Sequence, residues 1–132
     1  MARVPRISDA EWEVMNVVWE SYPIAANDVV ERLAARRWQP NTVKTMLNRL
    51  VKKGALGFEA EGNRYLYLPR VSRKACVARE THSFVERVFG GDPASLLVHF
   101  ARQRAISADD IAELKRILAA PGKKRPPSDR KP

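Results

Sequence analysis

The chain has 132 residues, a net charge of +9 and 45% apolar residues, enough for one ordinary domain or two small ones with a real core. It contains no run near the roughly 18 apolar residues of a membrane span, and its N-terminal segment lacks the apolar centre of a signal peptide. A single cysteine, Cys76, excludes an intrachain disulfide and a thiolate metal cage within one chain. We therefore expect a folded cytoplasmic protein with no membrane insertion.

Basic residues concentrate in one acid-free stretch. No acidic residue lies between Arg32 and Phe58, whereas the residues before Arg32 carry an acidic excess. The basic residues of this stretch are Arg32, Arg36, Arg37, Lys44, Arg49, Lys52 and Lys53. Such a positive field favours a polyanionic partner. Residues 121–132 are also basic and rich in proline, which predicts a disordered tail that inflates the net charge.

Two short helices are predicted first. A capping-box pattern from Ser8 to Glu11 predicts a helix that runs from Asp9 to about Glu20. Its inward face is formed by Trp12, Val14, Met15, Val18 and Trp19, which favours a core role for both tryptophans over stacking on bases. After a link in which Ile24 could pair as a one-residue strand, Asn27 is predicted to cap a second helix over 28–37.

The third predicted helix begins at Pro40 and ends before Gly54. Proline fits the first helical turn, and glycine tolerates the left-handed conformation that follows a helix. One face is apolar, with Val43, Met46, Leu47, Leu50 and Val51. Two helices so closely joined match a helix-turn-helix, in which the second helix enters the major groove of DNA.

The opposite face of this third helix carries side chains that can bond to base edges or phosphates. Those predicted to lie nearest base edges are Asn41, Thr42, Thr45 and Asn48. Those predicted to lie nearer phosphates are Lys44, Arg49 and Lys52. On this helix alone, an ordinary solvated face would show the same pattern, so the neighbouring elements must decide between the two readings.

A β-hairpin is predicted next. Residues 56–60 and 64–68 have strand character, and Glu61-Gly62-Asn63 between them is typical of a hairpin turn. A helix-turn-helix followed by a hairpin is a winged helix. Arg64 lies next to the tip of this wing, where it could reach phosphate or the minor groove, although Glu59 and Glu61 weaken the attraction.

Three helices are predicted after the wing, over about 72–89, 93–103 and 108–120, opened by Ser72, Asp92-Pro93 and Ser107. Helices this small bury little surface alone, so we expect them to form a dimerisation domain with a second copy. The residues predicted for dimerisation are Phe84, Val85, Val88, Leu96, Leu97, Phe100, Ile111, Leu114 and Leu118. The predicted fold is therefore mainly α with a small β wing: a winged helix-turn-helix domain over 1–70, a three-helix dimerisation domain over 71–120, and the tail.

Catalytic chemistry has few candidates. Cys76, His82 and His99 could in principle supply a nucleophile and base or a metal site. Cys76 and His82 lie about 120° off a common helical face, and no glycine-rich or acid-rich loop accompanies them. We expect no catalytic residue, no metal and no cofactor. A lone cysteine on an amphipathic helix favours a packed apolar role, and a redox-sensitive or metal-responsive Cys76 at the dimer interface is the alternative.

Four motifs carry a family resemblance over about residues 6–118: ISDAEWEVMNVVW, NTVKTMLNRLVKKGAL, GNRYLYLPRVSR and SADDIAELKRIL. Together they resemble the BlaI/MecI family of bacterial winged-helix repressors, the penicillinase repressors, and their copper-responsive relatives of the CopY type. The resemblance implies a homodimer, held by the C-terminal helices, that binds a palindromic operator overlapping a promoter. The alternative function is a basic adaptor that binds an acidic protein without reading DNA sequence.

The resemblance also implies how repression ends. In the β-lactam branch, a pathway from a membrane sensor metalloprotease leads to repressor cleavage between an asparagine and a phenylalanine. The aligned bond here is His99–Phe100, in which the phenylalanine matches and the asparagine does not. The copper branch uses a C-terminal pair of CxC motifs, and this chain has neither.

Overall fold

The computed structural model describes residues 3–120, which excludes the predicted basic tail. The chain forms two compact units, Met1–Glu80 and Thr81–Pro132. The units therefore divide after residue 80, whereas the sequence placed the domain boundary after residue 70. The reason is that Val71 and Cys76 are buried in the N-terminal core, so the chain just beyond the wing belongs to the first unit.

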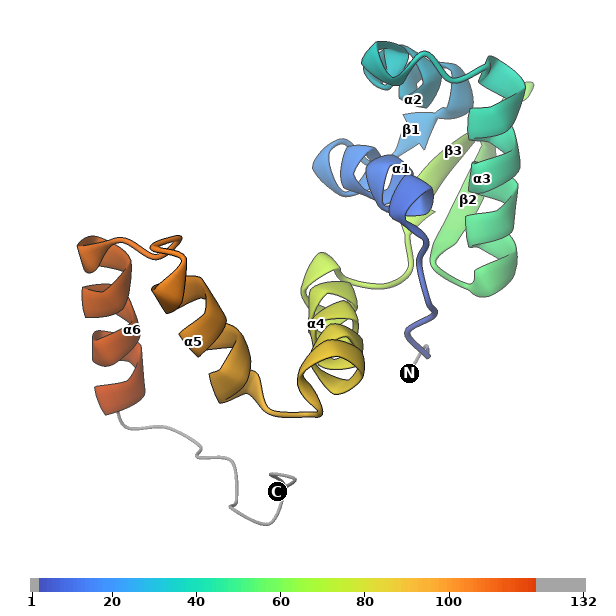
Figure 1. Cartoon of the computed structure of the whole chain (residues 1–132). Helices are drawn as coiled ribbons and strands as arrows, with labels where there is room; N and C mark the ends of the chain where they lie inside the picture. The colour runs from blue at the N-terminus through green and yellow to red at the C-terminus, as the bar shows by residue number, and fades with distance from the viewer. Residues whose placement is uncertain (1–2, 121–132) are drawn as a thin grey trace. The chain divides into compact units, whose positions relative to one another are not determined.

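Two helices of the N-terminal unit, both drawn in Figure 1, begin at local sequence signals. Helix α1 spans Asp9–Glu20 and starts with the predicted capping box, in which Ser8 Oγ accepts from the Glu11 N–H and Glu11 Oε1 accepts from the Ser8 N–H. Helix α3 spans Pro40–Lys53, with Pro40 in its first turn. Gly54 follows with a φ of 87°, the left-handed conformation that glycine adopts without strain. Both predictions are confirmed.

The second helix differs from its prediction. Strand β1 (Ile24–Ala25) is followed directly by α2 (Ala26–Arg32), and Ala25 occupies the N-cap without a side-chain hydrogen bond. The predicted cap at Asn27 is wrong, because pairing of β1 keeps the backbone extended up to Ala25 and the helix begins at the next residue. The predicted C-terminal end is a separate 3₁₀ turn, η1 (Ala34–Arg36), followed by Arg37 with a φ of 58°.

The wing is a hairpin within a three-stranded antiparallel sheet of order β1-β3-β2. Strands β2 (Leu56–Glu61) and β3 (Arg64–Pro69) pair from Leu56↔Pro69 to Glu61↔Arg64, so that Gly62 and Asn63 form the turn. Aromatic rings stabilise one face of the hairpin, with the Phe58 and Tyr65 centroids 4.5 Å apart. The predicted winged helix is confirmed.

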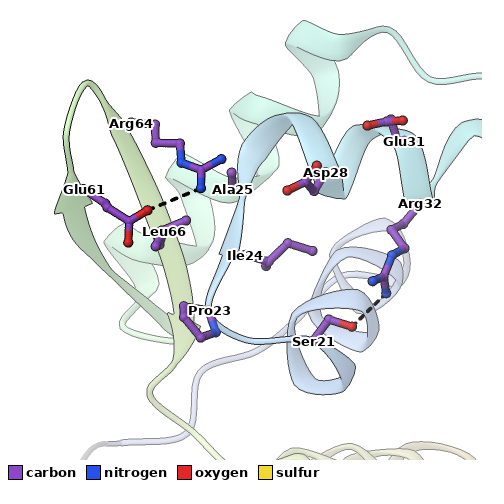
Figure 2. Close-up of a pocket in the computed structure, with 10 residues that line it drawn as sticks. All are labelled: Ser21, Pro23, Ile24, Ala25, Asp28, Glu31, Arg32, Glu61, Arg64 and Leu66. Atoms are coloured by element: carbon purple, nitrogen blue, oxygen red, sulfur yellow. Dashed lines mark hydrogen bonds and ion pairs between the residues drawn. The ribbon is translucent and has the colours of Figure 1, made fainter.

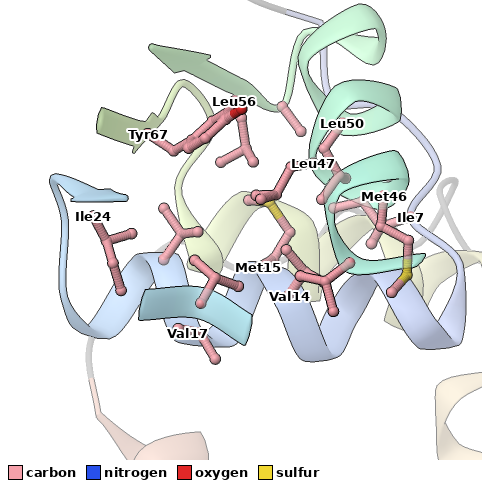
Figure 3. Packing of buried hydrophobic residues seen from close by; sticks show 14 of the residues in the cluster. Ile7, Val14, Met15, Val17, Ile24, Met46, Leu47, Leu50, Leu56 and Tyr67 are labelled. Carbon is pink, nitrogen blue, oxygen red and sulfur yellow. The ribbon is translucent and has the colours of Figure 1, made fainter. Parts of the chain in front are cut away.

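The core lies where α1, α2 and α3 pack against the sheet (Figure 3). Its largest fully buried apolar side chains are Val14, Met15, Val18, Val29, Val43, Leu47, Leu50 and Leu56. Trp12 and Trp19 pack at the edge of this core, and Trp19 Nε1 donates to the Val71 carbonyl at 3.0 Å. Cys76 is buried in the same core, where burial raises the pKa of its thiol despite the opposing charge of Arg79. Cys76 is therefore a packed apolar side chain of the N-terminal unit.

The remaining helices begin at their predicted signals, and the first of them also ends at the predicted pair of glycines. Helix α4 (Arg73–Phe89) is followed by two glycines with positive φ, α5 (Pro93–Arg102) is capped by Asp92, and α6 (Ala108–Ala119) has a capping box at Ser107. Helices α5 and α6 have no buried residue within the described chain. Of the nine residues predicted for dimerisation, all of them described, Val85 alone is buried. In residues 3–120, no helix is long and apolar enough to cross a membrane.

Candidate nucleic-acid interface

Helix α3 presents one continuous polar face to solvent. Its apolar residues Val43, Leu47 and Leu50 are buried against the core, which turns the other side of the helix outward. All seven α3 residues predicted to face DNA are exposed: Asn41, Thr42, Lys44, Thr45, Asn48, Arg49 and Lys52. Lys44 and Lys52 have no acidic partner among the described residues, so both ammonium groups are available to a polyanion.

The hairpin places another cation beside this face. Arg64 lines a surface hollow of about 250 Å³ together with Lys44 of α3, Asp28 of α2 and Tyr65 of β3, so two cations face one carboxylate there. Arg64 also contacts Glu61 at 3.3 Å, and both side chains are largely exposed. An exposed pair of this kind is weak, so Arg64 can leave its partner at little cost. The structure therefore brings the predicted wing cation and a predicted α3 cation to one hollow.

A second hollow shares Asp28 and Arg64 with the first but has a different balance of charges. This hollow lies between the wing, β1 and α2 and has a volume of about 580 Å³. Figure 2 shows the residues that line it. Its charged lining residues are Asp28, Glu31, Arg32, Glu61 and Arg64, three carboxylates against two guanidinium groups. Arg32 is held there by a hydrogen bond to Ser21 Oγ at 2.8 Å. This hollow lacks the positive excess that a polyanion needs, which leaves the α3 side as the candidate interface.

Lys53, the last residue of α3, is directed inward. Its Nζ lies 2.5 Å from Glu11 Oε1 of α1 and donates to the Arg6 carbonyl at 2.9 Å. Residues four apart on a helix are offset by about 40°, so Thr45, Arg49 and Lys53 form a row that leads from the polar face toward α1. The last member of that row holds the helix in place, and its charge is already paired.

Glu11 lies next to the candidate site, a position that was not predicted from the sequence. Its side chain is 1% exposed, yet it lies 3.8 Å from the Arg49 guanidinium as well as beside Lys53. Burial raises its pKa, but hydrogen bonds from Lys53 and from the Ser8 N–H outweigh that effect, so the pKa lies below its ordinary value. A signal was present: Glu11 occupies the first place of an i, i+3, i+4, i+7 pattern whose other members are Val14, Met15 and Val18.

No comparable arrangement favours catalysis. Cys76 is buried in the core, whereas His82 and His99 are exposed on α4 and α5. Across residues 3–120, no group of three or more histidine, cysteine or acidic side chains is placed to hold a metal ion. The α3 face remains the feature that the fold presents most clearly.

A helix-turn-helix with an exposed polar second helix and a β-hairpin beside it defines the winged-helix class of DNA-binding proteins. The sequence model described as Penicillinase repressor matches residues 7–120, and the chain belongs to that family. The resemblance inferred from the four sequence motifs is confirmed, and with it the repressor and antibiotic-resistance regulator character of the relatives.

Individual relatives agree with this assignment. The chain is 39% identical over 119 residues to the penicillinase repressor of Bacillus licheniformis, covering 89% of this chain and 93% of the relative. It is 34% identical over 113 residues to the methicillin resistance regulatory protein MecI of Mammaliicoccus sciuri, covering 85% and 92%. The solution structure of the DNA binding domain of the repressor BlaI is 44% identical with a TM-score of 0.50, covering 55% of this chain and 90% of that chain.

Proposed function

We propose that the protein is a bacterial transcriptional repressor that binds a palindromic operator as a homodimer in the cytoplasm. The exposed polar face of α3 is the observation that carries this proposal, because it is the basic surface with free hydrogen-bonding groups. Family membership and the names of the relatives support the repressor role. A bound dimer would block transcription by excluding RNA polymerase from the promoter.

Within each half-site, α3 enters the major groove. Asn41, Thr42, Thr45 and Asn48 are the proposed base-edge contacts, since amide and hydroxyl groups can both donate and accept hydrogen bonds there. Lys44, Arg49, Lys52 and Arg64 are the proposed phosphate contacts, which position the protein without reading sequence. Lys44 and Arg64 line one hollow, where their two positive charges exceed the single negative charge of Asp28, and this supports a phosphate path between α3 and the wing.

Dimerisation is assigned to the second unit. Phe84, Leu97 and Phe100 are each about 40% exposed in the single chain, and an exposed apolar set of this kind needs a partner surface. A second copy meets that need and presents two α3 helices about 34 Å apart, or at a multiple of that spacing. Linking two half-sites makes the second contact intramolecular and raises the affinity of the whole.

Release of repression is assigned to the same unit. The His99–Phe100 bond lies inside α5, so a sensor-linked protease would need this helix to open before the bond could enter an active site. Helix α5 has no buried residue in the described chain, which keeps the cost of such local opening low. Cleavage would detach α6 and lower operator affinity without touching the α3 face.

The test is a binding comparison on duplex DNA. The full chain should bind the palindrome upstream of its own gene, lose affinity when one half-site is scrambled, and weaken steeply as salt rises. Absence of any complex with that DNA would favour the alternative, a basic adaptor for an acidic protein.

A further inference from the structure

The two carboxylate oxygens of Glu11 have unequal surroundings. Glu11 is the buried charged residue of the described core, at 0% exposure. Its Oε1 accepts from the Ser8 N–H at 2.9 Å and from Lys53 Nζ at 2.5 Å. Its Oε2 is buried with no hydrogen-bond partner. A buried acceptor left without a donor carries a desolvation cost, so Oε2 has unused capacity to bind a donor.

Arg49 is the donor placed to use that capacity. Its Nη1 lies 3.8 Å from Glu11 Oε2, about 1 Å beyond an ordinary hydrogen bond. A guanidinium group has five N–H donors in a planar fork, so one edge can bind a carboxylate while another edge binds a phosphate. The Arg49 side chain is 56% exposed, which leaves its outer edge free.

We propose that Glu11 is a positioning residue for the DNA interface, acting through Arg49. On operator DNA, the inner edge of the Arg49 guanidinium closes onto Glu11 Oε2, and the outer edge binds a backbone phosphate. The carboxylate orients the Arg49 guanidinium before the phosphate binds, which reduces the side-chain entropy that is lost on binding. This inference rests on the proposed function. It adds that Glu11, a buried acidic residue, favours binding to a polyanion.

The direction of the change in DNA affinity when Glu11 is replaced distinguishes this proposal from a simple effect of net charge. If Glu11 only contributed negative charge, its removal would strengthen DNA binding, because the protein would become more positive. If Glu11 orients Arg49, its removal weakens binding despite the gain in net positive charge. Lysine in place of Arg49 gives a second distinction, since a point charge on a flexible stem cannot hold two anions in a fixed fork.

The first experiment measures Kd for the full-length protein on its operator duplex as a function of salt, for wild type, Arg49→Lys and Arg49→Ala. Arg116→Lys is the control, because Arg116 is also an exposed arginine paired with a glutamate, Glu113, but lies on α6 of the second unit rather than on α3. We expect both Arg49 variants to bind about tenfold more weakly, with Arg49→Ala lowering the salt slope by about one unit and Arg49→Lys retaining it. The Arg116→Lys protein should match wild type. An Arg49→Lys protein with wild-type affinity would overturn the proposal.

The second experiment is a double-mutant cycle between Glu11→Gln and Arg49→Lys, on proteins whose circular dichroism matches wild type. Glu11→Gln should weaken binding about threefold to tenfold, and the double variant should bind no more weakly than Arg49→Lys alone. Tighter binding by Glu11→Gln, or independent multiplication of the two effects, would overturn the inference while wild-type binding still supports the repressor function. If wild type shows no palindrome-dependent binding, the proposed function itself fails.

Discussion

Lys53 Nζ lies 2.5 Å from Glu11 Oε1, so the last turn of α3 is tied to the first turn of α1 across 42 residues of sequence. The carboxylate is buried, whereas the ammonium group is partly exposed. The same carboxylate serves the α1 capping box through Ser8. One acidic group thus fixes both the start of α1 and the end of α3.

Lys53 should therefore contribute mainly to folding stability, and Lys52 mainly to DNA binding. We expect Lys53→Met to lower the free energy of unfolding by about 2 kcal/mol or more, because it leaves a buried carboxylate with one donor fewer. Lys52→Ala should leave unfolding nearly unchanged, weaken DNA binding on all sequences and flatten the salt slope by about one unit. Urea unfolding and salt-dependent Kd measurements on both variants check this. A reversal of the two phenotypes would contradict the directions assigned to the two side chains.

Acid should destabilise the N-terminal unit through Glu11. The folded pKa of Glu11 lies below its ordinary value of 4.5, so its contribution to stability is fully present above that value and is lost as the pH falls through the folded pKa. The Glu11→Gln protein should be less stable at neutral pH and should show a shallower loss of stability in the acid range. Urea unfolding from neutral pH to about pH 3 measures this. A Glu11→Gln protein whose stability matches wild type across this pH range would contradict the assignment.

Asn48 tests base reading. Replacing Asn48 by alanine should cost about 1–3 kcal/mol on the operator and relax the preference at one base pair, because an amide contact to a base edge would be lost. Kd values on the operator and on single-base variants measure this effect. A uniform loss across all sequences, with the preference intact, would instead place Asn48 on the phosphate backbone.

Leu97 tests the assignment of dimerisation. Its side chain is 44% exposed in the single chain, so Leu97→Asp should leave the fold of one protomer intact while placing a charge on the proposed dimer surface. We expect a monomer in analytical ultracentrifugation, with reduced affinity for a full palindrome and little change on a single half-site. Arg102→Glu, at the exposed end of the same helix, is the control. A dimeric Leu97→Asp protein would move the interface elsewhere.

Much of this fold follows from local signals. The helix starts at Ser8, Pro40 and Ser107 and the stop at Gly54 were predictable because each signal satisfies the backbone of its own helix end. The start of α2 was not, because Asn27 is a good cap whose preference is overridden by pairing of Ala25 with Leu66, some forty residues away in sequence. For the candidate site, exposure of the α3 face followed from periodicity. The contacts of Glu11 with Lys53 and Arg49 did not, because they join two helices that are far apart in the sequence.

The pairing order β1-β3-β2 has a mechanical consequence. Strand β3 of the hairpin is bonded on its other edge to β1, and α2 begins at the residue after β1. The hairpin is thus joined to the helix-turn-helix by the backbone pairing of β3 with β1, from Ile24↔Tyr67 to Ala25↔Leu66. In the proposed DNA complex, a change in groove width that displaced the wing tip at Gly62 would be transmitted through β3 and β1 to α2. The protein would then respond to local DNA shape through the hairpin as well as through α3.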